Sequence, residues 1–459
     1  MKKRILLIML AFMLIAASIS ACGQASDTTK TTGSTTNATS NPSENSDSSG
    51  STANTSNDLY SGEKVNLKMM VWNQVEAYET LNQKLFEHFP EIKSKVDIEV
   101  VVGGDGDKGV AEKLRLLLAS NEQLPDMVRL NYTQFYEFAT YDLLYDMSDA
   151  VSVYKDDIFD KVLDLMTYEG KILCLPQEVK PKIWYYRKDI FDECSIKVDE
   201  IKTVEDFIEA AGIIYKKTGK YIENYMPPES AYDLFMLLSG NGGRLSDENG
   251  NFICASDENV KRAFEIIKSY NDSGYFAPIS EWSADWQAAF SQEILVSQLI
   301  ASWMKQHLIQ WVPEQAGKWV CALWPEEIRY GSDGGMGMWV VLKDSKTPSL
   351  SADILAKYSF DKDYRKEVFR YNGIIPPLKS AQNDPDYYVH DYFGEDLARV
   401  YFEALDYLAV YPYTPTQSMQ QTIIMQYLDE YVNGNMTVED ALEAAQNDMI
   451  NQIGNAWNQ

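Results

Sequence analysis

Residues 65–72 read VNLKMMVW and open the stretch that decides the fold. This apolar run predicts a strand. The spacing of apolar residues from Glu76 to Phe89 predicts a helix, which Pro90 ends. The alternation continues with a strand, a helix and a short strand over Val96–Val102, Val110–Ser120 and Asp126–Leu130. Strands that alternate with helices predict an α/β fold with a parallel sheet covered on both faces.

In open sheets of this kind, ligands bind beyond the carboxyl ends of the strands. The segments there are Trp72–Gln74 and Asn131–Thr133, which we therefore expect to face a ligand. Further along, Ser246–Gly250 predicts a hairpin turn, and the segments 260–270 and 438–453 have the periodicity of amphipathic helices.

The N-terminus has the pattern of an export signal. Positive residues at 2–4 precede an apolar segment, Ile5–Ala17, which is too short to span a bilayer. Ile19-Ser-Ala-Cys22 follows and resembles a bacterial lipobox. The resemblance implies that residues 1–21 are removed and that Cys22 is acylated. An ordinary secretory peptide cleaved near Ala21 is the alternative, and either reading predicts an exported protein.

The next segment predicts a tether. Residues 23–58 include 18 Ser or Thr and no aromatic or large aliphatic side chain, so they cannot bury a core. We expect residues 22–62 to be a disordered link between a lipid anchor and a folded body. The remaining residues are too many for one ordinary core and predict two large lobes.

The composition excludes some classes of protein. The 459 residues carry 41 Lys and Arg against 68 Asp and Glu, a formal charge of −27. Such a chain repels nucleic acid and anionic membrane surfaces. Ten Trp and 29 Tyr supply flat apolar rings for binding. The three His and five Cys lack the spacing of a metal site, and we expect no metal and no cofactor.

Short motifs in a fixed order carry a resemblance to a known family. They are Leu124–Val128, Tyr141–Ser148, Gly170–Pro176, Ile183–Phe191, Asn241–Gly243, Ala288–Phe290 before Trp303, Gly334–Gly335, Gly373–Pro376 and Thr437–Leu442. From Trp72 to its end, the chain resembles the family 1 extracellular solute-binding proteins of ABC importers, the class of maltose-binding protein. It departs from the family at Arg187, where Asn is usual. It also departs at Glu293–Ser297, where Gly-Lys-x-Ala-Met is common.

The resemblance implies the two-lobed, type II periplasmic-binding-protein fold, with a ligand cleft between lobes joined by crossover segments. Lobe I is expected to contain residues 63–179 and about 338–374. Lobe II is expected to contain residues 180–337 and about 375–459. The implied partners are a small solute, most simply an oligosaccharide, and the permease subunits of an ABC transporter. The implied location is outside the cytoplasmic membrane, with the protein anchored by lipid at Cys22 and monomeric.

The residues expected to bind the solute are aromatic rings and polar side chains, because a sugar presents C–H faces and hydroxyls. The resemblance places Trp303 and Tyr232 at stacking positions, and Trp72, Glu76, Asn131 and Tyr132 on loops that face the cleft. Weaker candidates are Lys180, Trp184, Trp286, Gly335 and Trp339. Lys180 stands where maltose-binding protein has an acidic contact, which argues for a different ligand chemistry.

Other motifs have simpler explanations. Gly104-Asp-Gly-Asp-Lys-Gly109 has the spacing of a dinucleotide-binding loop, but its two acidic residues would repel a pyrophosphate. Asp247-x-Asn249 lacks the glutamate of a calcium loop. The chain contains no G-x-S-x-G or H-E-x-x-H motif, and we expect no enzyme activity. An exported carbohydrate-active enzyme, a surface adhesin and a receptor for a non-sugar solute remain alternatives.

Overall fold

The alternating segments of the N-terminal third form most of a five-stranded sheet. It is seen in the computed structural model, which describes residues 59–457 except 105, 121, 227–230, 333–335, 389 and 395. The strand order is β2 (Val96–Val102), β1 (Val65–Val71), β3 (Met127–Asn131), β10 (Gly337–Val341) and β6 (Leu175–Pro176). β1 pairs with β2 and β3 in parallel, as predicted, whereas β10 is antiparallel to both β3 and β6. The sheet is therefore mixed, because β10 enters it late in the chain and in the opposite direction.

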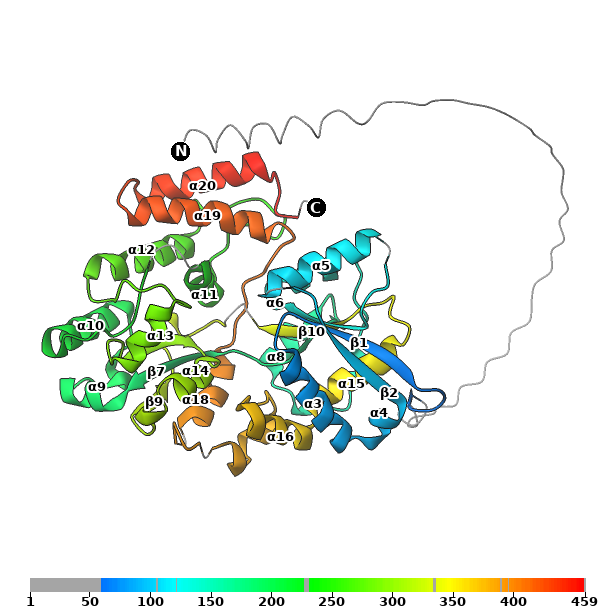
Figure 1. Ribbon diagram of the computed structural model, residues 1–459. Coiled ribbons are helices and arrows are strands. Elements are labelled where there is room, and N and C mark those ends of the chain that lie inside the picture. Colours follow the sequence, from blue (N-terminus) through cyan, green and yellow to red (C-terminus); the bar gives the residue numbers. More distant parts are fainter. Residues whose placement is uncertain are drawn as a thin grey trace, which may run out of the picture. The chain divides into compact units, whose positions relative to one another are not determined.

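Helices lie around this first sheet (Figure 1). The predicted helices appear as α3 (Val75–His88) and α5 (Gly106–Ser120). The remaining elements of this part are α4 (Pro90–Lys95), α6 (Tyr132–Thr140), α7 (Ser148–Val151), α8 (Asp160–Met166), β4 (Thr167–Tyr168), β5 (Lys171–Ile172), α15 (Pro348–Phe360) and α16 (Lys362–Asn372).

A second sheet contains three strands, in the order β8 (Ser297–Ala301), β7 (Lys182–Arg187) and β9 (Trp319–Ala322), all antiparallel. α9 (Lys188–Cys194) and α18 (Asp396–Ala404) pack against it. Around them are α10 (Val204–Thr218), α11 (Ala231–Asn241), α12 (Glu258–Ser273), α13 (Ala284–Ser291), α14 (Met304–Trp311), α17 (Lys379–Gln382), α19 (Gln417–Val432) and α20 (Val438–Gln452). Short 3₁₀ turns are η1 (Lys155–Asp157), η2 (Val198–Glu200), η3 (Pro313–Gln315), η4 (Glu326–Ile328), η5 (Pro385–Tyr387) and η6 (Leu405–Tyr407).

Local sequence fixes several of these helices. Thr203 caps α10, because its hydroxyl accepts the Asp206 N–H at 3.1 Å and the Asp206 carboxylate accepts the Thr203 N–H at 2.9 Å.

The predicted amphipathic helices are α12 and α20, and α19 and α20 pack on α12 (Figure 1). The predicted hairpin at Ser246–Gly250 is confirmed by the bridge between Ser246 and Phe252. No helix among the described residues has the length and apolar character needed to cross a bilayer.

The chain passes between the two sheets three times, after β6, after β9 and after α16. A bridge between Pro181 and Ser332 joins the first two crossovers. The buried Lys182 reinforces this junction, since its ammonium donates to the carbonyls of Ile328 at 3.0 Å and Tyr330 at 2.6 Å. The described residues belong to one compact unit, within which the two sheets form the two lobes of an α/β fold. The residue boundaries expected for each lobe stay predictions.

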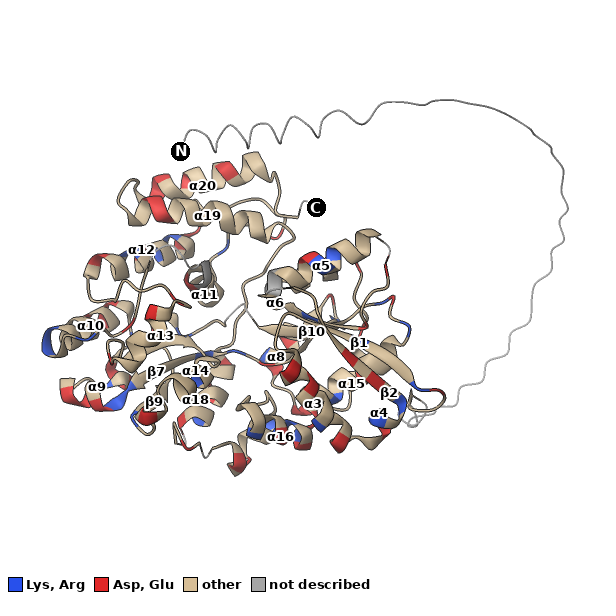
Figure 2. Cartoon of the chain, viewed as in Figure 1, with Lys and Arg blue, Asp and Glu red and all other residues tan. Residues whose placement is uncertain are grey.

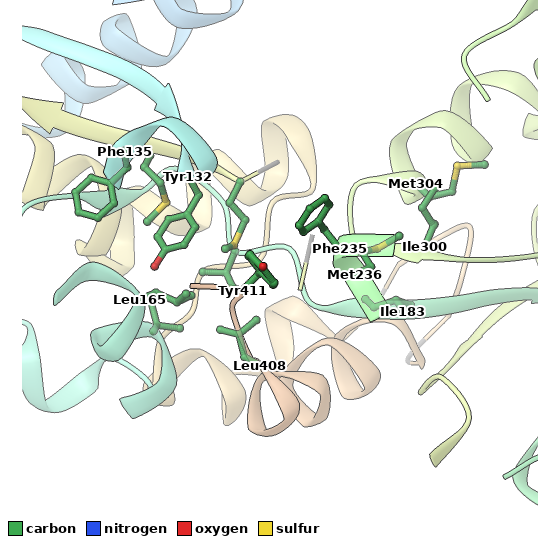
Figure 3. Close-up of a cluster of buried hydrophobic side chains, with 14 of the residues drawn as sticks. Tyr132, Phe135, Leu165, Ile183, Phe235, Met236, Ile300, Met304, Leu408 and Tyr411 are labelled. Carbon is green, nitrogen blue, oxygen red and sulfur yellow. The ribbon is translucent and has the colours of Figure 1, made fainter. Parts of the chain in front are cut away.

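The core runs through both sheets and contains large rings as well as aliphatic side chains. Figure 3 shows Tyr132 and Phe135 near Leu165, and Phe235 and Met236 near Ile183 and Ile300, all of them buried. The acidic residues, in contrast, are spread over many helices (Figure 2). This distribution is that of a solvated acidic surface.

Two features of the sequence now have structural explanations. Cys174, Cys194, Cys254 and Cys321 are free, buried thiols. The glycines of the 104–109 segment allow two backbones to meet, because a Cβ on Gly104 would lie 2.6 Å from the Gly109 Cα. Packing therefore accounts for this glycine spacing.

The two departures from the family pattern meet in space. The guanidinium of Arg187, with a side chain 3% exposed, contacts Asp189 at 2.7 Å and Glu293 at 2.9 Å. Glu293 has a φ of 55°, a conformation that favours glycine. Its carboxylate also accepts from Lys220 at 3.3 Å. The ion pair thus holds a glutamate where the family commonly has glycine.

We expect Arg187 and Glu293 to be energetically coupled. A double-mutant cycle with Arg187→Asn and Glu293→Gly should give a coupling free energy of about 1–2 kcal/mol, the range of a hydrogen-bonded charged pair. Denaturant unfolding of the four proteins measures it. Strictly additive losses in the double mutant would show that the two departures are independent.

Candidate functional site

A cavity of about 1630 Å³ lies between elements of both sheets. The loop after β1 and the first crossover line one part of it, and α11, α14 and the loop before α13 line another. Ligand pockets are usually about 300–1,000 Å³. This cavity therefore has room for an extended molecule of several units.

Aromatic rings form one wall of the cavity. Trp303 stands at the start of α14, and its indole stacks on Trp282 with centroids 4.9 Å apart and planes inclined by 25°. His307, one turn into α14, meets both rings edge to face, at 5.5 and 5.4 Å. Burial lowers the pKa of His307, which favours the neutral imidazole. The wall offers flat, uncharged surfaces to a ligand.

Carboxyl groups form a second wall, with Glu223, Asp233 and Glu281 all lining the cavity. Burial raises the pKa of Asp233 to about 7. Burial, together with the charge of Asp233, raises the pKa of Glu281 to about 8. The pKa of Glu223 is also raised by burial, although its carboxylate accepts the Leu299 N–H at 3.1 Å. Asp233 and Glu281 therefore exchange protons near neutral pH, and a carboxyl of this wall can accept hydrogen bonds or, when protonated, donate one.

Basic side chains line other parts of the cavity. The Arg129 guanidinium lies over the ring of Trp72, 3.5 Å from its centroid. The buried Lys305 ammonium lies 3.5 Å from the Glu178 carboxylate, and burial lowers the pKa of this lysine. The cavity therefore combines rings, carboxyls and cationic donors, which together suit a polar molecule with apolar faces.

The structure brings three of the predicted site residues into the cavity lining, namely Trp72, Lys180 and Trp303. Glu76 is exposed on the first turn of α3 and is not part of the lining. Asn131 and Tyr132 are buried at the end of β3 rather than open to the cavity. Tyr132 packs on Phe135, Tyr136 and Tyr413 because α6 and a late segment of the chain cover this strand end.

Three weaker candidates lie in the core instead. Trp184, Trp286 and Trp339 are each 0% exposed, so none presents a face to a solute. Trp184 packs on Phe191 and Phe207, Trp286 on Trp311, and Trp339 on Tyr78 and Tyr358. The side chain of Tyr232, Gly335 and Cys22 lie outside the described residues. Solute binding by Tyr232 and Gly335 stays a prediction.

Sequence reasoning missed much of the lining, including Trp282, Glu223, Asp233, Glu281 and Arg129. The available signal was the pairing of an acid with an aromatic residue, as in Glu281-Trp282 and in Glu223-Asn-Tyr225. That signal is weak, because the same pairs occur in ordinary surface loops. The acids also come from three separate segments, which only the tertiary fold brings together.

Metal binding has no support in the described part of the chain, where no group of three His, Cys, Asp or Glu side chains is arranged to hold an ion. Asp247, in the candidate calcium motif, accepts hydrogen bonds from the N–H groups of Asn249 at 2.9 Å and Asn251 at 2.8 Å. Its carboxylate therefore closes its own turn.

Comparison with known proteins agrees with this geometry. A profile of the bacterial extracellular solute-binding proteins matches residues 84–391. The chain belongs to this family. The family resemblance inferred from the ordered motifs is thus confirmed. Because the match runs from α3 to the loop before α18, this solute-binding protein carries the family pattern on both sheets, with the cavity between them.

Relatives of this solute-binding protein include two with named ligands. An arabinooligosaccharide-binding protein of Halalkalibacterium halodurans is 25% identical over 72% of the chain and 78% of the relative. A lactose-binding protein of Rhizobium radiobacter is 25% identical over 75% of the chain and 83% of the relative. The galacto-N-biose-/lacto-N-biose I-binding protein of Bifidobacterium longum has the same fold, with a TM-score of 0.69 and 20% identity over 86% of the chain and 99% of that structure.

Proposed function

We propose that this extracellular solute-binding protein captures an oligosaccharide and delivers it to the permease of an ABC transporter. The observation that carries the proposal is the cavity in which stacked indoles stand beside carboxyls and cationic donors. Pyranose and furanose rings present C–H patches to aromatic faces and hydroxyls to planar polar groups. The sugars named for the two relatives support the same class of solute.

The proposed mechanism is closure of the two lobes, with no chemical bond changed. A ligand that contacts both lobes stabilises the closed form by its differential affinity for that form. The three crossovers are the segments that would bend, and the junction at Lys182 would hold the first two in register. The closed form would present a joint surface to the permease.

A thermal-shift screen tests the proposed ligand class. Arabino-oligosaccharides, lactose, lacto-N-biose and maltose are each added to the purified protein, with amino acids and short peptides as the comparison. A ligand that binds only the folded protein raises its stability by RT ln(1 + [L]/Kd), about 2.7 kcal/mol at 100 times Kd. We expect at least one sugar to raise the melting temperature. A rise with peptides or amino acids alone would assign a non-sugar solute instead.

We propose that Cys22 anchors the protein to the membrane by acylation. The support is the lipobox-like Ile19–Cys22 segment, followed by a segment too polar to bury a core. Cys22→Ala should release the protein from membranes and leave its melting temperature unchanged, because the tether separates anchor and lobes. Membrane fractionation checks this result. Equal recovery of Cys22→Ala and wild type with membranes would reject acylation at Cys22.

A further inference from the structure

Trp282 is the most exposed tryptophan of the cavity. Its side chain is 64% exposed and lines the cavity from the loop between α12 and α13. Its indole lies on Trp303, while much of its surface stays open. A single exposed ring is ordinary on a protein surface, but this ring lines a cavity and stacks on a second indole, which places its open face where a ligand would lie.

The backbone at Trp282 is also unusual. Its φ is 64°, in the left-handed region that bulky side chains seldom adopt. Trp282 is the third residue of the Ser280–Ser283 turn, which the Ser283 hydroxyl closes by donating to the Ser280 carbonyl at 2.7 Å. Glycine or asparagine is favoured at such a position. A tryptophan with this φ destabilises the folded state, and strained residues of this kind cluster at ligand-binding sites.

The residues beside Trp282 restrict the chemistry of what it binds. Glu281 precedes it in the same turn, and Asp233 and Glu223 line the cavity with it. Among the described residues, no Lys or Arg forms an ion pair with any of these three carboxyls. Where these carboxyls are ionised, an anionic ligand would meet their negative charge, whereas hydroxyls can donate to or accept from carboxyl groups in either protonation state.

We propose that Trp282 is the main stacking surface for one uncharged sugar unit of the solute, and that Glu281, Asp233 and Glu223 bind the hydroxyls of that unit. This inference rests on the proposed function and deepens it by naming the subsite and its selectivity. The subsite accepts sugars with free hydroxyls and binds uronic acids more weakly at a pH high enough to ionise its carboxyls. Trp303 then serves as the support that holds the Trp282 ring in place.

The test uses Trp282→Gly, which removes the ring and relieves the backbone at the same position. The full-length protein is titrated by calorimetry with each sugar that raises the melting temperature of wild type. We expect the affinity to fall by about 30-fold or more, as lost stacking implies. The melting temperature of the unliganded variant should stay equal to that of wild type or rise.

Two comparisons sharpen the result. Trp282→Phe keeps a flat ring and should restore at least a third of the binding free energy that Trp282→Gly loses. Trp457→Phe changes an exposed tryptophan outside the cavity lining and should leave the affinity unchanged. Charge selection is probed at pH 9, where the carboxyls are ionised, with the best-binding hexose sugar of the screen and the same sugar oxidised to the acid at C6; the acid should bind at least ten-fold more weakly than its parent sugar. Wild-type affinity in Trp282→Gly, or equal binding of the acid, would overturn the inference while leaving the proposed function intact. A wild type that binds no sugar would overturn both.

Discussion

Trp303→Ala should weaken sugar binding roughly 30- to 150-fold. A stacked ring shares an apolar patch of roughly 80–120 Å² with a sugar, which is worth on the order of 2–3 kcal/mol at about 25 cal/mol per Å². Trp303 lines the cavity and also supports the Trp282 ring, so its loss removes one face of the aromatic wall and the support of another. Isothermal titration of wild type and variant with the same sugar measures the change.

The buried Trp286 provides the matched control. It lies in the same aromatic cluster but is 0% exposed, and its indole N–H donates to Asn224 at 2.9 Å. Trp286→Ala should cost about 3–5 kcal/mol of folding stability, as for other large core truncations. Trp303→Ala should melt much closer to wild type, since Trp303 is only half-buried. If Trp303→Ala instead melts as early as Trp286→Ala yet binds sugar normally when folded, Trp303 is structural.

Asp233→Asn should stabilise the unliganded protein at pH 8 by on the order of 2–4 kcal/mol, with little effect near pH 4. Burial raises the pKa of Asp233 to about 7, above the value of about 3.9 expected in the unfolded chain. The folded state therefore holds this proton more tightly than the unfolded state does. The stability contributed by the protonated group is complete below pH 4 and is lost as the pH rises to 7. Asparagine, which is neutral throughout, avoids that loss.

Denaturant unfolding at several pH values between 4 and 8 measures this effect. Glu281 and Glu223 face the same cavity and should add to the slope in wild type, because the pKa of each is also raised. Asp199→Asn, at an exposed aspartate that is not part of the cavity lining, is the control and should keep the wild-type slope. A wild-type slope in Asp233→Asn would show that Asp233 is not held protonated by burial.

The N-terminal strands and helices could be predicted because their apolar periodicity is local. β1, β2, α3 and β3 begin and end within a few residues of the expected positions. The resemblance predicts that residues from about 338 belong to lobe I, but the antiparallel direction of β10 was not expected, because it depends on a pairing with β3 that spans about two hundred residues of chain. Local patterns carry no information about such a pairing.

The candidate site could be predicted only in part, because it too depends on contacts between distant segments of the chain. Trp72 and Trp303 follow from family position, and both line the cavity. Asn131 and Tyr132 are also at a strand end, but Tyr413 and α6 cover them. Trp282 owes its place to a positive φ, which the sequence of its turn does not indicate. Burial by distant segments and unusual backbone geometry are thus what sequence patterns leave out.

The central claim is that the cavity between the lobes binds a sugar. The most direct measurement is a crystal structure of the protein with the sugar that raises its melting temperature most. The account predicts a sugar ring lying on the indole of Trp282, with hydroxyls within hydrogen-bonding distance of Glu281, Asp233 or Glu223. Sugar density at another place on the protein, with this cavity occupied by solvent alone, would contradict it.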